Sequence, residues 1–270
     1  MSFQIAERHR FCRAKPAPIP EERKAFETKA MVIKMKITCV LEHNGDDSLL
    51  YAVEYVGAYT RGESEEVTLS KMKGEIEAYA RWLGEPAPES VEAEIIARKS
   101  STLAIKDADS DVIFESEREE LTADEYKRLK TIALKSAEDF LALYESIPDK
   151  NAVAAPPRRT FYGQVPRSAN EMYEHTKRVN EYYFSEIGAD ADNEGSIVEC
   201  RKRGFEAIEA MPDFLQNRTV EGSYGEEWSL RKVLRRFIWH DRIHAKAMYK
   251  TAKKLFPDCP VASPFHFEEK

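Results

Sequence analysis

Residues 226–256, EEWSLRKVLRRFIWHDRIHAKAMYKTAKKLF, decide the fold, and they contain neither glycine nor proline. Apolar side chains recur in this stretch at steps of three and four residues, and His240 and His244 fall in the same row. That period marks one face of a helix. We therefore expect a long amphipathic helix with a solvated basic face opposite the apolar one. The predicted basic face consists of Arg231, Lys232, Arg235, Arg242, Lys246, Lys250 and Lys253.

His240 and His244 lie one helical turn apart on the apolar face. Side chains at i and i+4 stand over each other, so two such imidazoles can bind one metal ion. A pair of this kind more often packs or forms hydrogen bonds in a core, because a metal ion needs further ligands. The metal hypothesis therefore depends on a third ligand from elsewhere in the chain.

Composition narrows the class of protein. Of the 270 residues, 42% are hydrophobic and 33% are charged, which is typical of a globular protein with one large domain or two ordinary ones. The net charge of −7 argues against a nucleic-acid partner, and no apolar run approaches the length of a membrane span. We expect a cytoplasmic protein whose cysteines are free thiols, since no two of them form a C-x-x-C pair. The cysteines are Cys12, Cys39, Cys200 and Cys259.

The N-terminal part divides into two segments. Residues 1–30 are polar, contain three prolines and show no period, which predicts a disordered arm. A translation start at Met31 or Met35 is the alternative. Residues 31–117 predict a small α+β domain. Its expected elements are a strand from Met35, a turn at 43–46, a strand at 49–56, a loop between Gly57 and Gly62, a helix from Ser64 to Gly84, and strands at 91–97 and 112–115.

Residues 118–270 predict a four-helix bundle. Thr122 is followed by Glu125, and Ser168 by Glu171, and this spacing of three residues is typical of a capping box at a helix start. The expected helices run from Thr122 to Pro148, from Ser168 to Gly188, from Gly195 to Met211, and through residues 226–256. Each carries one apolar stripe, and four such helices bury their stripes against one another in a bundle. The fold class is thus a two-domain α+β chain.

His175 supplies the third candidate ligand. It lies on the apolar stripe of the second predicted bundle helix, as His240 and His244 do on the fourth. Histidines that project inward from facing helices are how bundles build metal sites. The other three histidines, at positions 9, 43 and 266, fall in the expected arm, a turn and a C-terminal loop. His175, His240 and His244 are therefore the candidate ligands of a metal site.

Three short segments resemble the DinB/YfiT-like bundle proteins, a family of metal-binding four-helix bundles. They are YEH at 173–175, EWSLRKVL at 227–234 and WHDRIH at 239–244, and the resemblance covers residues 121–256. It implies that the three histidines bind a divalent ion, zinc or nickel, with the remaining positions open to water or substrate. Family members often continue after the last histidine with Gly-Gln, whereas Ala245-Lys246 follows here.

The N-terminal part is similar to HicB-like domains, through YVGA at 55–58, RGES at 61–64 and KGEI at 73–76. That similarity rests on a hairpin, a loop with glycine and a helix. If the chain is a non-catalytic protein, we expect this part to recruit a partner. A homodimer formed through a face of the bundle is a further expectation for the chain.

Two functions follow from these observations. The first is a metal-dependent enzyme, a hydrolase or a thiol transferase, acting on a small-molecule substrate. The second is a non-catalytic, metal-stabilised binding or regulatory protein, and a histidine-lined core without metal is a third possibility. No acid or base is evident: Asp241 is expected at the surface or beside a metal ligand, and Glu171 at a helix cap. Packing or solvated roles are expected for Tyr182, Tyr183 and Arg236.

Overall fold

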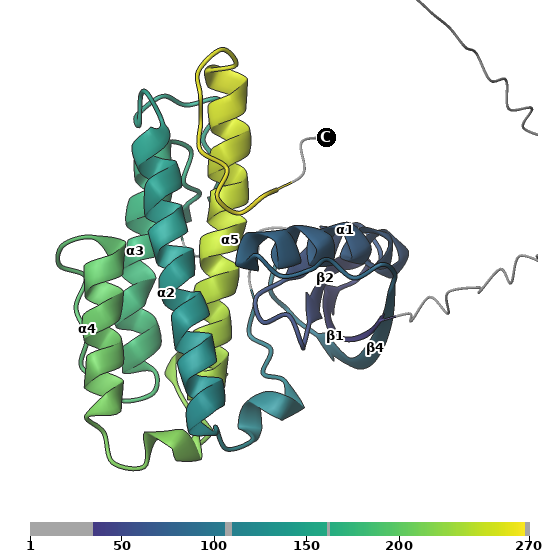
Figure 1. Ribbon diagram of the computed structural model, residues 1–270, viewed down its shortest axis with the longest axis vertical. Helices are drawn as coiled ribbons and strands as arrows, with labels where there is room; N and C mark the ends of the chain where they lie inside the picture. Colours follow the sequence, from purple (N-terminus) through teal and green to yellow (C-terminus); the bar gives the residue numbers. More distant parts are fainter. Residues whose placement is uncertain (1–34, 106–109, 161–162, 268–270) are drawn as a thin grey trace, which may run out of the picture. The chain divides into compact units, whose positions relative to one another are not determined.

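The computed structural model describes residues 35–105, 110–160 and 163–267. Within them the chain is a mixed α+β protein with five α-helices and a small N-terminal sheet, which confirms the α+β part of the predicted class (Figure 1). The expected arm at 1–30, with His9 and Cys12, lies outside the described residues. Cys39, Cys200 and Cys259 are free thiols, as predicted.

The sheet has four strands in the order β3-β2-β1-β4. β1 and β2 form the predicted antiparallel hairpin, and Gly45 provides the left-handed residue of its turn (φ +59°). β4 pairs parallel to β1, because helix α1 connects β3 to β4 across the sheet. The elements are β1 (Met35–Asn44), β2 (Asp47–Ala52), β3 (Tyr59–Gly62), α1 (Glu65–Leu83) and β4 (Val91–Ser100).

Two predictions for this region are wrong. The expected loop between Gly57 and Gly62 contains β3, which pairs antiparallel with β2. The expected strand at 112–115 is absent, and a short 3-10 helix, η2 (Glu115–Arg118), follows an irregular segment. That segment bonds to α5 and to side chains of the sheet instead of adding a strand: the carbonyl of Val112 accepts a hydrogen bond from Arg235, and the N–H of Asp111 donates to the carboxylate of Glu42 in β1.

Both faces of the sheet are covered at its centre. On one face, Ile37 and Cys39 pack in the same core as Met72 and Ile76 of α1. On the other face, Val40, Leu49 and Tyr51 share a core with Trp239 and Ile243, which belong to helix α5 (Leu230–Leu255). The sheet therefore meets α5 directly, and the contact buries apolar side chains from both.

The helical region consists of four helices that pack side by side. α2 and α3 each contact both α4 and α5. Ser and Thr residues cap every one of them, and the capping boxes predicted at Thr122 and Ser168 are present. Gly204 permits the close approach of α3 and α4, because a Cβ there would lie 2.1 Å from the ring of Phe184. These helices are α2 (Ala123–Ser146), α3 (Ala169–Ser185), α4 (Ile197–Glu209) and α5.

Short elements complete the connections between the helices. Two small hairpins lie before α3 and before α5. The elements are β5 (Arg159–Thr160), β6 (Gly163–Gln164), β7 (Val220–Glu221), β8 (Glu227–Trp228) and the 3-10 helices η3 (Phe214–Gln216) and η4 (Ser223–Gly225). The fourth predicted helix thus begins later than expected, because residues 227–228 are a strand and Ser229 caps α5.

The predicted solvated basic face of α5 is wrong for three of its members. Lys232, Arg235 and Arg242 are 0–1% exposed, because the sheet region and residues 110–118 pack against that side of the helix. Each cation has an acidic partner. The pairs are Lys232 with Glu226, Arg235 with Glu117, and Arg242 with Glu75.

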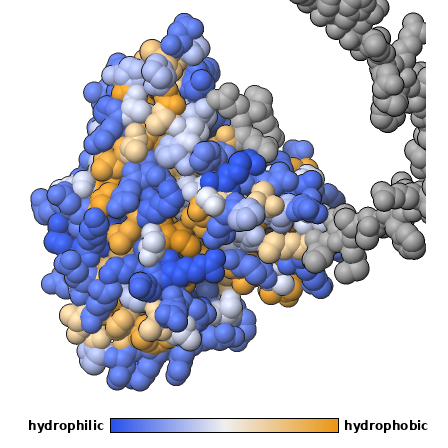
Figure 2. Space-filling model, viewed as in Figure 1, coloured by the Kyte–Doolittle hydropathy of each residue, from blue (hydrophilic) through white to orange (hydrophobic). Residues whose placement is uncertain are grey.

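The described residues belong to one compact unit that starts at residue 33, and one hydrophobic core runs through the sheet and the helices. Figure 2 shows a surface that is mostly hydrophilic in this view, with hydrophobic patches along the helices. None of the described helices is long and apolar enough to cross a membrane.

Candidate metal centre

The three predicted histidines come together between α3 and α5. His175 lies in the first half of α3, and His240 and His244 lie one turn apart in the middle of α5. One ring nitrogen from each side chain lies within 4.8 Å of the other two, a spacing that could hold a metal ion. The ring centroids are 4.5 to 5.2 Å apart.

Burial keeps these imidazoles in the form that binds metals. His240 is buried, whereas His175 and His244 are partly exposed. Removal from water lowers the pKa of all three, because it disfavours the charged ring. The neighbouring imidazoles add to the effect at His240 and His244, and Arg178 adds to it at His175. The three rings are therefore neutral at pH 7, and neutral imidazole is the metal ligand.

A buried nitrogen in the cluster lacks a hydrogen-bond partner among the described residues. It is Nδ1 of His240. An unpaired buried polar atom costs about 1–3 kcal/mol, so it calls for an explanation. Tyr183 and Trp239 lie against the same ring with their centroids 6.1 Å away, which makes its surroundings largely apolar. A metal ion bound by the three rings would be coordinated by imidazole nitrogens that otherwise need hydrogen-bond partners. The residues present therefore fit a divalent ion.

Asp241, the residue after His240, takes no part in the cluster. It is fully buried, and its carboxylate accepts hydrogen bonds from Arg201 of α4 and from Ser136 of α2. This arrangement excludes the surface position considered for Asp241. It ties α5 to α2 and α4 on the side of the helix that Asp241 faces.

The other acid–base candidates also have structural roles. The Glu171 carboxylate accepts hydrogen bonds from the backbone N–H groups of Arg167 and Ser168, as predicted for a helix cap. Arg236 donates to the Tyr183 hydroxyl and to the carbonyl of Ser110. Tyr182 packs against Trp228. In the part of the chain that is described, no carboxylate or thiol joins the three histidines.

Sequence reasoning missed one residue beside the cluster, Arg178. It is exposed, and it lies three residues after His175 on α3, close enough to lower the pKa of that imidazole. The i,i+3 spacing could have identified it, since residues three apart share a helix face. Arg178 therefore places a positive charge near the partly exposed His175.

The three histidines could hold a divalent ion, and His175 and His244 are partly exposed to solvent. Comparisons with known proteins yielded no match to a family model, to a curated protein or to a solved structure. The geometry of the three histidines is therefore the basis for any function assigned to the chain.

Proposed function

We propose that the chain is a divalent-metal-binding protein of the DinB/YfiT-like class, and that it uses the ion as a metal-dependent hydrolase or thiol transferase. The observation that carries the proposal is the convergence of His175, His240 and His244, whose ring nitrogens lie within 4.8 Å of one another. Packing of α2 and α3 against both α4 and α5 supports a bundle of that class. Zinc and nickel are the proposed ions, because imidazole suits both.

The ligand set favours catalysis over a closed structural site. Three neutral imidazoles leave a divalent ion its full charge and at least one open position. Such an ion lowers the pKa of a bound water or thiol and polarises a carbonyl group. The protein would hold the ion through the three histidines, and Arg178 near the partly exposed His175 would favour a substrate with negative charge.

Metal content is the direct test. We would purify the protein without an affinity tag and measure zinc and nickel by elemental analysis, beside the His240→Ala/His244→Ala variant. The expected result is a near-stoichiometric ion in the wild type and its loss in the variant. His43→Ala is the matched control, since His43 lies in the β1–β2 hairpin and bonds to Gly45 and Ser100. Equal metal in all three proteins, or none in the wild type after loading, would refute the site.

A non-catalytic metal-binding or regulatory protein is the second candidate. One observation favours it: among the described residues no carboxylate joins the three histidines as an acid or base. The N-terminal part, which is similar to HicB-like domains, would then be the partner-binding module. Exchange of water on the bound metal separates the two functions. A cobalt-substituted protein whose ion has no exchangeable water would favour the regulatory function, and rapid exchange would favour the enzyme.

A further inference from the structure

The free edge of the sheet is the surface that the metal site leaves unexplained. β4 has ten residues and pairs with β1 on one side only, within the described part of the chain. Its last five residues are all exposed, and Ile96 is 57% exposed. A long edge strand presents unpaired backbone N–H and C=O groups that can pair with another strand.

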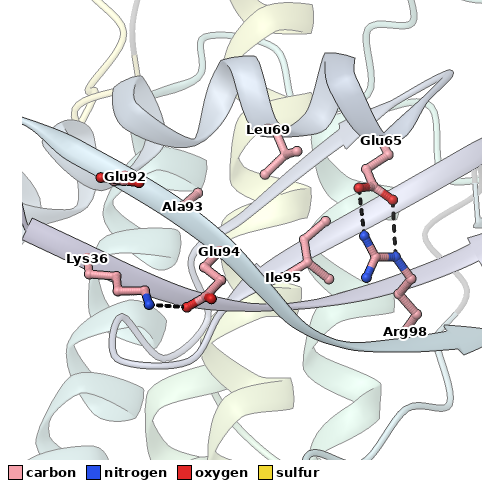
Figure 3. Close-up of a pocket in the computed structure, with 8 residues that line it drawn as sticks. All are labelled: Lys36, Glu65, Leu69, Glu92, Ala93, Glu94, Ile95 and Arg98. Atoms are coloured by element: carbon pink, nitrogen blue, oxygen red, sulfur yellow. Dashed lines mark hydrogen bonds and ion pairs between the residues drawn. The ribbon is translucent and has the colours of Figure 1, made fainter.

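A groove of about 330 Å³ runs beside this strand. Figure 3 shows Leu69 of α1 and Ile95 of β4 in its middle, with an ion pair toward each end. Arg98 binds the carboxylate of Glu65 through two nitrogens, and Lys36 pairs with Glu94. The groove therefore combines an apolar centre with charged margins, which suits an added strand.

The charges along β4 are ordered by sign. The strand reads VEAEIIARKS, with two acidic residues in its first half and two basic residues in its second half. Edges that avoid pairing commonly carry charged side chains, especially lysine. A strand whose charges are separated by sign behaves differently. If a second copy of the strand pairs with it antiparallel, acidic residues face basic ones, whereas in a parallel pair like charges face each other.

A β-bulge makes this complementarity possible on one face. Cys39 pairs with Ile95 and Val40 with Ala97, so Ile96 is the extra residue in β4. In β1, Lys36 pairs with Glu92 and Glu42 pairs with Lys99. Because of the bulge, Glu92 and Lys99 therefore lie on the same face of the sheet, the one away from α1. Without the bulge, residues seven apart would point to opposite faces.

We propose that β4 pairs antiparallel with β4 of a second copy of this chain, which joins two four-stranded sheets across a two-fold axis. The register that matches the faces places Glu92 opposite Lys99, Ala93 opposite Arg98, and Glu94 opposite Ala97. Ile95 then meets Ile96. No like charges face each other, and each pair occurs twice because the interface is symmetric.

Charge reversal tests the pairing in the full-length protein. Glu92→Lys and Lys99→Glu each turn two attractive pairs into two repulsive ones, so each variant should raise the dimer dissociation constant by about tenfold or more. The double variant Glu92→Lys/Lys99→Glu should recover the wild-type constant. An equimolar mixture of the two single variants should form a heterodimer, because both of its cross-strand pairs are attractive. Sedimentation velocity over a concentration series measures all four samples.

Glu145→Lys is the matched control, since Glu145 is exposed on α2 and its reversal changes the net charge as Glu92→Lys does. It should leave the dissociation constant unchanged. Backbone amide exchange at residues 91–100 of the wild type adds a test without substitution, and protection there should rise with protein concentration. A wild-type chain that stays monomeric overturns the proposal. A dimer with the same dissociation constant in both single variants, or one without concentration-dependent protection at β4, also overturns it and assigns the interface to another surface.

Discussion

Helix α5 buries polar side chains on two sides, and the cost of burying them is offset in a different way on each side. On the side of the sheet region, Arg235 and Arg242 each bind a carboxylate, and each guanidinium also lies over aromatic rings 4 to 6 Å away. On the side of α3, His240 and His244 lie against each other and against His175. A carboxylate of the protein neutralises each cation, whereas the histidines avoid charge by remaining neutral. Among the described residues, Nδ1 of His240 has no hydrogen-bond partner.

This difference separates a structural arrangement from a candidate site. A buried cation with its own carboxylate and aromatic neighbours fixes how the sheet region packs on α5. Its charge is compensated, although Nη1 of Arg235 and Nε and Nη1 of Arg242 have no hydrogen-bond partner among the described residues. Three desolvated imidazoles without an acid among them could instead take up an added ion. We therefore expect the first side to respond to loss of protein partners and the second to respond to metal and pH.

Removal of the partner of Arg242 should have the largest effect. Glu75→Gln keeps the shape of the side chain but leaves the fully buried guanidinium without a carboxylate, so we expect the free energy of unfolding to fall by about 3–5 kcal/mol. Urea denaturation measures it. Glu77→Gln on the same helix is the control, because its ion pair with Lys73 is exposed and should contribute less than about 1 kcal/mol. Similar losses in both variants would contradict the role of compensating carboxylates.

Zinc should have the next largest effect, and on the histidine side alone. A ligand that binds only the folded state at 100 times its dissociation constant stabilises that state by about 2.7 kcal/mol. Zinc should therefore raise the urea midpoint of the wild type by a corresponding amount, and a chelator should reverse it. His244→Ala should abolish the shift, while Glu77→Gln should retain it. A zinc response that survives His244→Ala would place the ion elsewhere.

Acid should destabilise the metal-free protein through the same histidines. Their pKa values are lowered in the folded state, so the unfolded chain takes up protons first as the pH falls below about 6.5. The free energy of unfolding therefore falls with decreasing pH, by up to about 1.4 kcal/mol per pH unit for each histidine that stays neutral. The variant with His175, His240 and His244 all replaced by Gln should lose this part of the slope between pH 6.5 and 5. Parallel curves for the two proteins would contradict the prediction.

The sequence predicted what depends on neighbours a few residues apart. Thr122 with Glu125 marked a helix start, and the i,i+4 spacing of His240 and His244 marked one inward face, because local geometry determines both. The burial of Arg235 and Arg242 could not be predicted in this way. Their carboxylates lie 118 and 167 residues away in the chain, and charge alone argued for a solvated face. Strand β3 was missed for the same reason, since its stability comes from pairing with β2.

Arg236 lies between the sheet side and the histidine side of α5, and its hydrogen-bond partner is Tyr183. The Tyr183→Phe variant tests whether the Tyr183 hydroxyl serves packing or the metal site. The Tyr183 hydroxyl accepts long hydrogen bonds of 3.3 and 3.4 Å from Arg236, which also binds the carbonyl of Ser110. If the tyrosine serves packing, the loss of these two long hydrogen bonds should lower the free energy of unfolding by about 1 kcal/mol, the smallest change of this series. The zinc content and the zinc-dependent shift in the urea midpoint should both stay at wild-type levels, because the ring that packs against His240 remains. Weaker zinc binding in Tyr183→Phe would instead assign the hydroxyl to the metal site. Tyr183 would then belong with the histidine side of α5, and Arg236 would be the residue that separates this side from the sheet side.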